Sequence, residues 1–191
     1  MEVKTFDIPG LALLLPQVFD DERGYFFESW NDAAYAALGL LDPTERFVQD
    51  NESGSKRGVV RGLHFQRPPF AQAKLMRVVR GRVMDVAVDI RVGSPTFGQY
   101  QVVSLSGENR HQFFIPAGFA HGFIALEEGT IFAYKVTAPY AKQCDGGIRF
   151  DDPAIDIPWP THDQLIVSEK DRLLPTLSEY LEQPAFRYEE C

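Results

Sequence analysis

Residues 82–91 read Arg-Val-Met-Asp-Val-Ala-Val-Asp-Ile-Arg, and this stretch decides the fold class. Four large apolar side chains alternate with other residues in it: Met84, Val86, Val88 and Ile90 against Val83, Asp85, Ala87 and Asp89. Alternation with a period of two predicts a β-strand. One face of this strand is expected to be apolar. The face with the two aspartates is expected to be solvated or to line a polar cavity.

Short segments of the same kind recur along the chain. We expect strands at Tyr25–Trp30, Gln99–Leu105, Phe113–Ile115, Phe123–Leu126 and Thr130–Thr137, and two short extended pieces within residues 1–19. The segments 123–126 and 130–137 are interpreted as a hairpin across residues 127–129. Many short strands with few helices predict an all-β sandwich or small barrel.

Helices are expected at two places only. Asn31 or Asp32 is a good N-cap for a short helix that runs to Leu38 and ends at Gly39. A last short helix is expected at Thr176–Leu181.

The composition favours one folded domain, residues 1–191, because 45% of the 191 residues are apolar and 15 are Phe. The formal net charge of −8 disfavours a nucleic-acid partner. An anionic small ligand is still compatible with this charge if it has a local cationic pocket.

The cysteine count and the N-terminus bear on location. Cys144 and Cys191 form neither a disulfide framework nor a metal cluster. The apolar run Leu11–Leu15 is too short for a signal peptide or a membrane span. We therefore expect a cytoplasmic protein with no membrane partner.

The most informative stretch for function is Arg-Gly-Leu-His-Phe-Gln at residues 61–66, followed shortly by Lys74. His64 and Gln66 share one face of a strand, so that face meets a cavity or solvent. A lone histidine is most often a hydrogen-bonded structural residue, and a lone lysine is most often exposed. Together these residues suit binding an anion while moving a proton, with Lys74 as a cation for a developing oxyanion.

His121, in the dense stretch 116–123, raises the question of a metal. Metal sites in small β-barrels typically have three or four His and carboxylate ligands. Gln66 stands where a His-x-His pair would need its second histidine, and residues 67–73 contain no Glu. The sequence therefore disfavours a metal site.

Other polar residues are ambiguous one by one. Tyr134 is either core packing or a proton donor, and the polar turn 168–171 is either exposed or carries a carboxylate that orients a histidine. Arginines suit a diphosphate, and side chains two apart on a strand suit a base or sugar. The remaining candidates are Arg23, Glu28, Gln49, Asn51 and Arg61.

Taken together, these stretches make the chain similar to one known family of enzymes. It resembles the dTDP-4-dehydrorhamnose 3,5-epimerase family of L-rhamnose biosynthesis across about residues 20–172. The matching stretches keep the family's order: residues 21–28, 47–51, 60–66, 74–75, 81–83, 85–91, 94–98, 115–123, 134–135, 151–153 and 166–171.

The resemblance implies an all-β jelly-roll (cupin, double-stranded β-helix) that works as a homodimer without metal or other cofactor. It implies His64 as the base, Asp171 as its partner, Lys74 as the residue that stabilises an enolate, and Tyr134 as the acid. The positions that match substrate-binding residues are Arg23, Glu28, Gln49, Asn51, Arg61, His121, Asp145 and Lys170. Asp145 departs from the family, which often has Glu there.

The implied substrate is a dTDP-linked 4-keto-6-deoxy sugar, epimerised at C3 and C5 to dTDP-4-dehydro-L-rhamnose. A 4-keto group acidifies the protons on both carbons, so a base, a cation at O4 and an opposed acid are required. One base for two carbons requires ring movement or release of an intermediate. The alternatives are an epimerase of C3 or C5 alone, a non-catalytic sugar-binding cupin, and a metal-dependent cupin oxygenase.

Overall fold

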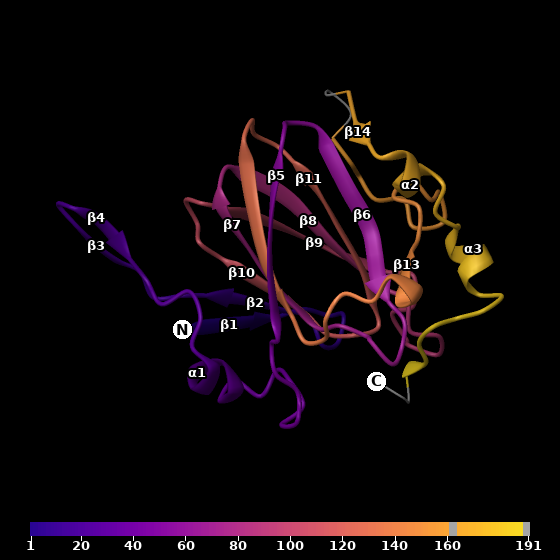
Figure 1. Ribbon diagram of the computed structural model, residues 1–191, viewed down its shortest axis with the longest axis horizontal. Coiled ribbons are helices and arrows are strands. Elements are labelled where there is room, and N and C mark those ends of the chain that lie inside the picture. The colour runs from indigo at the N-terminus through magenta and orange to yellow at the C-terminus, as the bar shows by residue number, and fades with distance from the viewer. Residues whose placement is uncertain (161–163, 189–191) are drawn as a thin grey trace.

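Two antiparallel sheets packed face to face make up the body of the protein (Figure 1). The computed structural model describes residues 1–160 and 164–188. The first sheet has the strand order β1 (Glu2–Thr5), β2 (Ala12–Leu15), β10 (Gln112–Ile115), β7 (Lys74–Arg80), β12 (Thr130–Val136) and β5 (Gln49–Ser55).

The second sheet lies opposite. Its strand order is β13 (Asp145–Gly147), β6 (Val59–Gln66), β11 (Phe119–Ala125), β8 (Arg82–Asp89) and β9 (Tyr100–Ser106), and β14 (Ile166–Val167) pairs in parallel with β6. The predicted all-β jelly-roll is confirmed.

The helices are short, as expected. They are α1 (Asp32–Ala36), α2 (Glu169–Arg172), α3 (Leu177–Tyr180) and a 3₁₀ turn at Lys142–Cys144. Asn31 caps α1 by accepting from the Ala34 amide at 3.2 Å. Thr176 and Glu179 form a capping box on α3. Both predicted helices are therefore confirmed, each ending earlier than expected.

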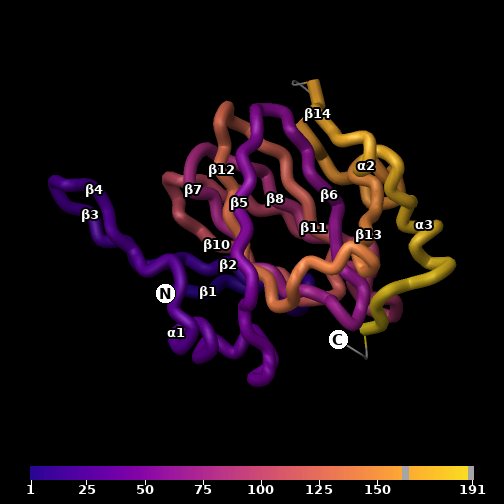
Figure 2. Tube along the Cα trace, viewed as in Figure 1, coloured from indigo at the N-terminus to yellow at the C-terminus, as the bar shows by residue number. Residues whose placement is uncertain are grey.

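The expected strand at Tyr25–Trp30 is only partly present. β3 (Phe19–Asp21) and β4 (Gly24–Phe26) pair with each other and form a separate two-stranded sheet. Residues 27–30 leave the strand because they lie beyond the last β3 partner. Figures 1 and 2 show this hairpin projecting away from the body of the protein.

The predicted hairpin between residues 123 and 137 is wrong. β11 pairs with β6 and β8, whereas β12 pairs with β5 and β7, so the turn at residues 127–129 connects the two sheets. The two strands meet through side chains instead of backbone bonds. Phe123 and Phe132 stack with ring centroids 4.2 Å apart in the core between the sheets.

The outer face of the second sheet is covered, and the outer face of the first sheet is covered in part. Apolar residues of the segment 148–186 pack on the second sheet, and residues around α1 pack on the lower part of the first. Figure 2 shows the C-terminal segment running along the outside of β6 and β13. None of the helices in the described part of the chain has the length and apolarity needed to span a bilayer.

The expectation for the aspartate face of residues 83–90 is also wrong. Asp85 and Asp89 are both fully buried, because β8 lies between two apolar layers. Each carboxylate has polar partners there. Asp89 accepts from the Arg91 guanidinium at 2.8 and 2.9 Å, and Asp85 lies 3.0 Å from His121. Buried charges persist in sheets when they are paired in this way. Cys144 is buried with a free thiol, and Cys191 lies outside the described residues.

The Phe123–Phe132 stack predicts a large stability effect. Phe132→Ala removes a ring that is 1% exposed and leaves a cavity between the sheets, so the free energy of unfolding should fall by about 3–5 kcal/mol. Leu181→Ala, at a side chain that is 46% exposed, should change it by about 0.5 kcal/mol. Urea unfolding of both variants measures the difference. A loss below about 1 kcal/mol for Phe132→Ala would show that the two sheets do not depend on this stack.

Candidate active site

A cavity of about 610 Å³ opens between the two sheets beside β6, β12 and α2. This volume suits a small-molecule ligand. Many of the predicted site residues line it: Arg61, His64, Lys74, His121, Tyr134, Asp145, Lys170 and Asp171. They come from both sheets and from α2, so the fold converges on this cavity.

An irregular register in β6 brings Arg61 and His64 to the same side. His121 lies opposite His64, but Phe123 lies opposite Arg61, so β6 has one more residue than β11 between these pairs. Residues three apart on a regular strand point to opposite faces, and a bulge re-aims one of them. Gly62, at φ +124°, occupies the bulge, where a Cβ would meet the Gly122 Cα at 2.6 Å. Only glycine fits this backbone and this approach.

His64 and Asp171 form the central pair. His64 Nε2 lies 2.7 Å from Asp171 Oδ1, and the Gly62 amide donates to Asp171 Oδ2 at 3.2 Å. The Asp171 amide donates to Ser168, the N-cap of α2. Burial acts to raise the pKa of Asp171, but the hydrogen bonds and charge of its neighbours, His64 first, lower it below the usual value. An ionised Asp171 therefore accepts the Nε2–H of His64 and leaves Nδ1 free to take a proton.

Lys74 is a buried ammonium at the start of β7. It is 8% exposed, and its Nζ donates to the His64 carbonyl oxygen at 3.1 Å. Burial lowers its pKa to about 8, against the opposing charges of Asp85 and Asp145. Lys74 is thus charged near neutral pH and lies next to the His64 residue.

His121 lies deeper, on β11. Its Nε2 is 3.0 and 3.1 Å from the two carboxylate oxygens of Asp85, and its ring stacks on Phe132. Burial lowers the pKa of His121, although Asp85 acts in the opposite direction. A neutral His121 that donates to Asp85 presents its other nitrogen as a hydrogen-bond acceptor.

Tyr134 belongs to the opposite sheet. It lies on β12, directly across from Asn51 of β5, and lines the same cavity as His64. Burial raises its pKa, with Arg61 acting against this shift, so the phenol keeps its proton at neutral pH. The cavity therefore has a proton acceptor on one wall and a proton donor on the other.

The mouth of the cavity has a polar cluster. Lys170 Nζ donates to Asp145 Oδ2 at 2.5 Å, and the Tyr140 hydroxyl donates to the same oxygen at 3.3 Å. Sequence reasoning missed Tyr140, which is 58% exposed and lines the cavity. Nothing but its place after Pro139 in the sequence distinguished it from other surface tyrosines.

Gln49 and Asn51 lie at the edge of this region. As predicted they share a face of β5, and Gln49 Nε2 donates to Asn51 Oδ1 at 2.8 Å. Gln49 Oε1 also accepts from the Tyr140 amide. Both amides thus lie close to the mouth, although neither is among the residues that line the cavity.

Gln66 has a different role. Its side chain hydrogen-bonds to Phe70, Pro139 and Ala141 and so holds the segment that carries Tyr140. Arg61 is held by Ser55 and the Gly54 carbonyl oxygen. In residues 1–160 and 164–188, no three His, Cys, Asp or Glu side chains converge as metal ligands.

Arg23 and Glu28 are not brought to the cavity of their own chain. Arg23 lies at the tip of the β3–β4 hairpin, where its guanidinium pairs with Asp21. Glu28 follows the hairpin and accepts from Asn31 Nδ2 at 3.0 Å. Neither residue lines the cavity that contains His64.

The fold and the site can be compared with known proteins. The sequence model of the dTDP-4-dehydrorhamnose 3,5-epimerase family matches residues 5–179. The dTDP-4-dehydrorhamnose 3,5-epimerases of Methanothermobacter thermautotrophicus and Salmonella typhimurium are 54% and 50% identical, over 89% and 91% of this chain and 90% and 94% of theirs.

Solved structures agree with this match. The dTDP-6-deoxy-D-glucose-3,5-epimerase of Legionella pneumophila, in complex with dTDP-4-keto-L-rhamnose, superposes with a TM-score of 0.93 at 45% identity, covering 98% of each chain. The likeness extends over both sheets and the segments that line the cavity. The chain belongs to the dTDP-4-dehydrorhamnose 3,5-epimerase family.

Proposed function

We propose that this protein epimerises dTDP-4-dehydro-6-deoxy-D-glucose at C3 and C5, giving dTDP-4-dehydro-L-rhamnose. The observation that carries the proposal is the His64–Asp171 pair facing a cavity that also holds the buried Lys74 ammonium and, on the other sheet, Tyr134. The complex of the Legionella protein with dTDP-4-keto-L-rhamnose supports this choice of product.

His64 is the base in this proposal. Its Nδ1 takes a proton from C3 or C5, and Asp171 stabilises the imidazolium that forms. The electron pair of the broken C–H bond moves to O4 and makes an enolate. Lys74 places a positive charge beside that oxygen, in a site where burial makes the interaction stronger than in water.

Tyr134 returns a proton from the opposite side. β12 and β6 belong to opposing sheets, so the phenol and the imidazole approach a sugar ring from different faces. Protonation on the face opposite to deprotonation inverts the carbon. Oxidation states do not change in these steps, so side chains alone supply the chemistry.

The nucleotide diphosphate is assigned to the polar residues around the cavity. Arg61 and Lys170 supply positive charge for the diphosphate. Gln49, Asn51 and Asp145 offer amides and a carboxylate near the mouth, and the exposed Tyr140 ring is suited to stack on a base. We assign His121 to a sugar hydroxyl, which would donate a hydrogen bond to the unprotonated ring nitrogen. The pairing of Asp145 with Lys170 gives this shorter carboxylate a place in the site.

We assign Arg23 and Glu28 to the cavity of a second copy of the chain. The hairpin that precedes Glu28 projects from the body (Figure 1), and Phe19 and Phe26 on it are 56% and 70% exposed. Exposed aromatic side chains of this size mark protein interfaces. A homodimer that covers them would bring both residues to the partner's substrate. One domain, residues 1–191, and a cytoplasmic location complete the proposal.

Deuterium incorporation tests double epimerisation. In D₂O the thymidine 4-keto sugar should acquire deuterium at both C3 and C5 of the product, because both protons pass through solvent-exchangeable groups. Proton and carbon NMR of the product identify the labelled carbons. Label at C3 alone or at C5 alone would replace the proposal with a mono-epimerase.

His64→Asn should reduce kcat by about 100-fold or more, the contribution of a positioned general base. The Kd for dTDP, measured by calorimetry, should stay within about threefold because the base contributes no nucleotide contact. Retained turnover in this variant would favour a non-catalytic or differently organised site.

Lys74 predicts the basic limb of the pH profile. Its ammonium is needed at O4 and is lost as pH rises through its pKa of about 8, so kcat/KM should fall above that pH. Tyr134 does not explain such a limb because its pKa is raised. The Lys74→Arg variant should have a lower kcat/KM than the wild type. Its kcat/KM should no longer fall above that pH, because a guanidinium keeps its charge. Lys142→Gln, at an exposed lysine, is the control and should keep the wild-type pH profile. If kcat/KM of Lys74→Arg still fell above the same pH, Lys74 would not be the group whose ionisation causes the fall.

A further inference from the structure

Residues 19–28, here called the arm, comprise β3, β4 and the segment to Glu28. The two strands of the arm pair only with each other and every one of their residues is exposed. An isolated two-stranded hairpin is marginally stable in water. Something in the body must therefore set the direction in which this arm leaves it.

The first contact is a stack of Arg110 on Tyr25. The Arg110 guanidinium carbon lies 3.7 Å from the centroid of the Tyr25 ring. The Nε of Arg110 is buried with no hydrogen-bond partner among the described residues, and its Nη1 donates to the Glu108 carbonyl oxygen at 3.2 Å. Cation–π contacts at this distance are attractive and directional.

The turn that carries Arg110 is itself well held. Asn109 accepts from the amides of Ser106 and His111 and donates to the Ser104 carbonyl oxygen. The Arg110 amide donates to the Ser106 carbonyl oxygen, and Arg110 adopts a positive φ of 56°. This turn therefore presents the guanidinium from a fixed backbone.

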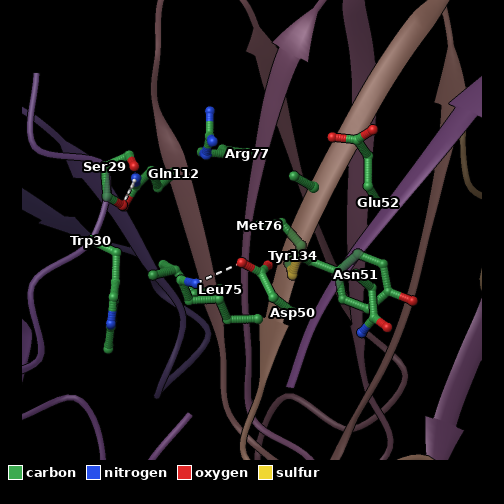
Figure 3. A pocket seen from close by; sticks show the side chains of 12 residues that line it. Ser29, Trp30, Asp50, Asn51, Glu52, Leu75, Met76, Arg77, Gln112 and Tyr134 are labelled. Atoms are coloured by element: carbon green, nitrogen blue, oxygen red, sulfur yellow. Dashed lines mark hydrogen bonds and ion pairs between the residues drawn. The ribbon is translucent and has the colours of Figure 1, made fainter. Parts of the chain in front are cut away.

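The second contact is made by Gln112, two residues further on. It is 1% exposed, and its Nε2 donates to the Ser29 carbonyl oxygen at 2.9 Å (Figure 3). Its Oε1 accepts from the Tyr35 hydroxyl at 2.6 Å. Burial raises the pKa of Tyr35 to about 12, so its hydroxyl remains a donor. Ser29 directly follows Glu28, which places this contact at the base of the arm.

We infer that Arg110 and Gln112 are positioning residues that aim the arm, and with it Arg23 and Glu28, at the cavity of the partner subunit. Arg110 in the turn holds the chain at Tyr25, and Gln112 at the start of β10 holds it at Ser29, on either side of residues 26–28. Contacts at two points fix the direction of the arm, whereas a single contact would let the arm rotate about it. An arm aimed in advance lowers the ordering cost of substrate binding. This inference rests on the proposed function and its homodimer.

The experiment compares kinetics of the wild type, Arg110→Ala, Tyr25→Leu and Tyr25→Phe on the thymidine 4-keto sugar. KM should rise about 2- to 30-fold in Arg110→Ala and Tyr25→Leu, the range expected for a lost cation–π contact. The kcat should stay within about twofold because His64, Lys74 and Tyr134 are untouched. Tyr25→Phe keeps the ring and should keep the wild-type KM.

The double variant Arg110→Ala/Tyr25→Leu should be no worse than either single variant, because both remove one contact. Multi-angle light scattering should find the same oligomeric state in all of them. An unchanged KM in the single variants, additive losses in the double one, or loss of the dimer would each overturn the inference. Tyr25→Leu changes an exposed ring and decides the matter if Arg110→Ala fails to fold. A wild type that does not turn over this substrate would instead overturn the proposed function.

Discussion

The close approach of β6 and β11 at Gly62 and Gly122 is the constraint on which the site depends. The two backbones are so close that no Cβ fits between them, and the extra residue of β6 is accommodated there. On a regular strand, Arg61 or His64 would point into the apolar layer under the C-terminal segment. The same bulge exposes the Gly62 amide to Asp171, so it also helps to hold the carboxylate that orients His64.

Charge in the interior is arranged around this backbone feature. Asp85 and Asp89 are both on β8, yet one is paired with His121 at the cavity and the other with Arg91 at the far end of the strand. Lys74 is buried within range of Asp85 and Asp145, whose charges keep its pKa from falling further. The sheet therefore supplies an ammonium that is charged at neutral pH but weakly solvated, which is the state that interacts most strongly with an anion.

Local patterns predicted much of this protein, and long-range geometry accounts for what they missed. The period-two alternation and the cap at Asn31 are local, so β8 to β12 and α1 were found, whereas α2 was expected to be a turn. The supposed hairpin at residues 127–129 failed because a turn sequence does not record which sheet receives the next strand. The burial of Asp89 follows from layers contributed by segments far away in sequence. The shared face of Arg61 and His64 depends on a bulge, and the remoteness of Arg23 and Glu28 depends on the course of the arm. Neither is visible in residue spacing.

Lys74 donates its hydrogen bond to the carbonyl oxygen of His64 itself. The imidazole and the ammonium, which come from opposite sheets, thereby meet at one peptide unit. In the proposed mechanism, this bond couples the position of the base to the position of the cation that faces O4. Under that mechanism, a sugar that is epimerised at both carbons during one binding event presents C3 and C5 in turn to this coupled pair by rotating or changing its ring pucker.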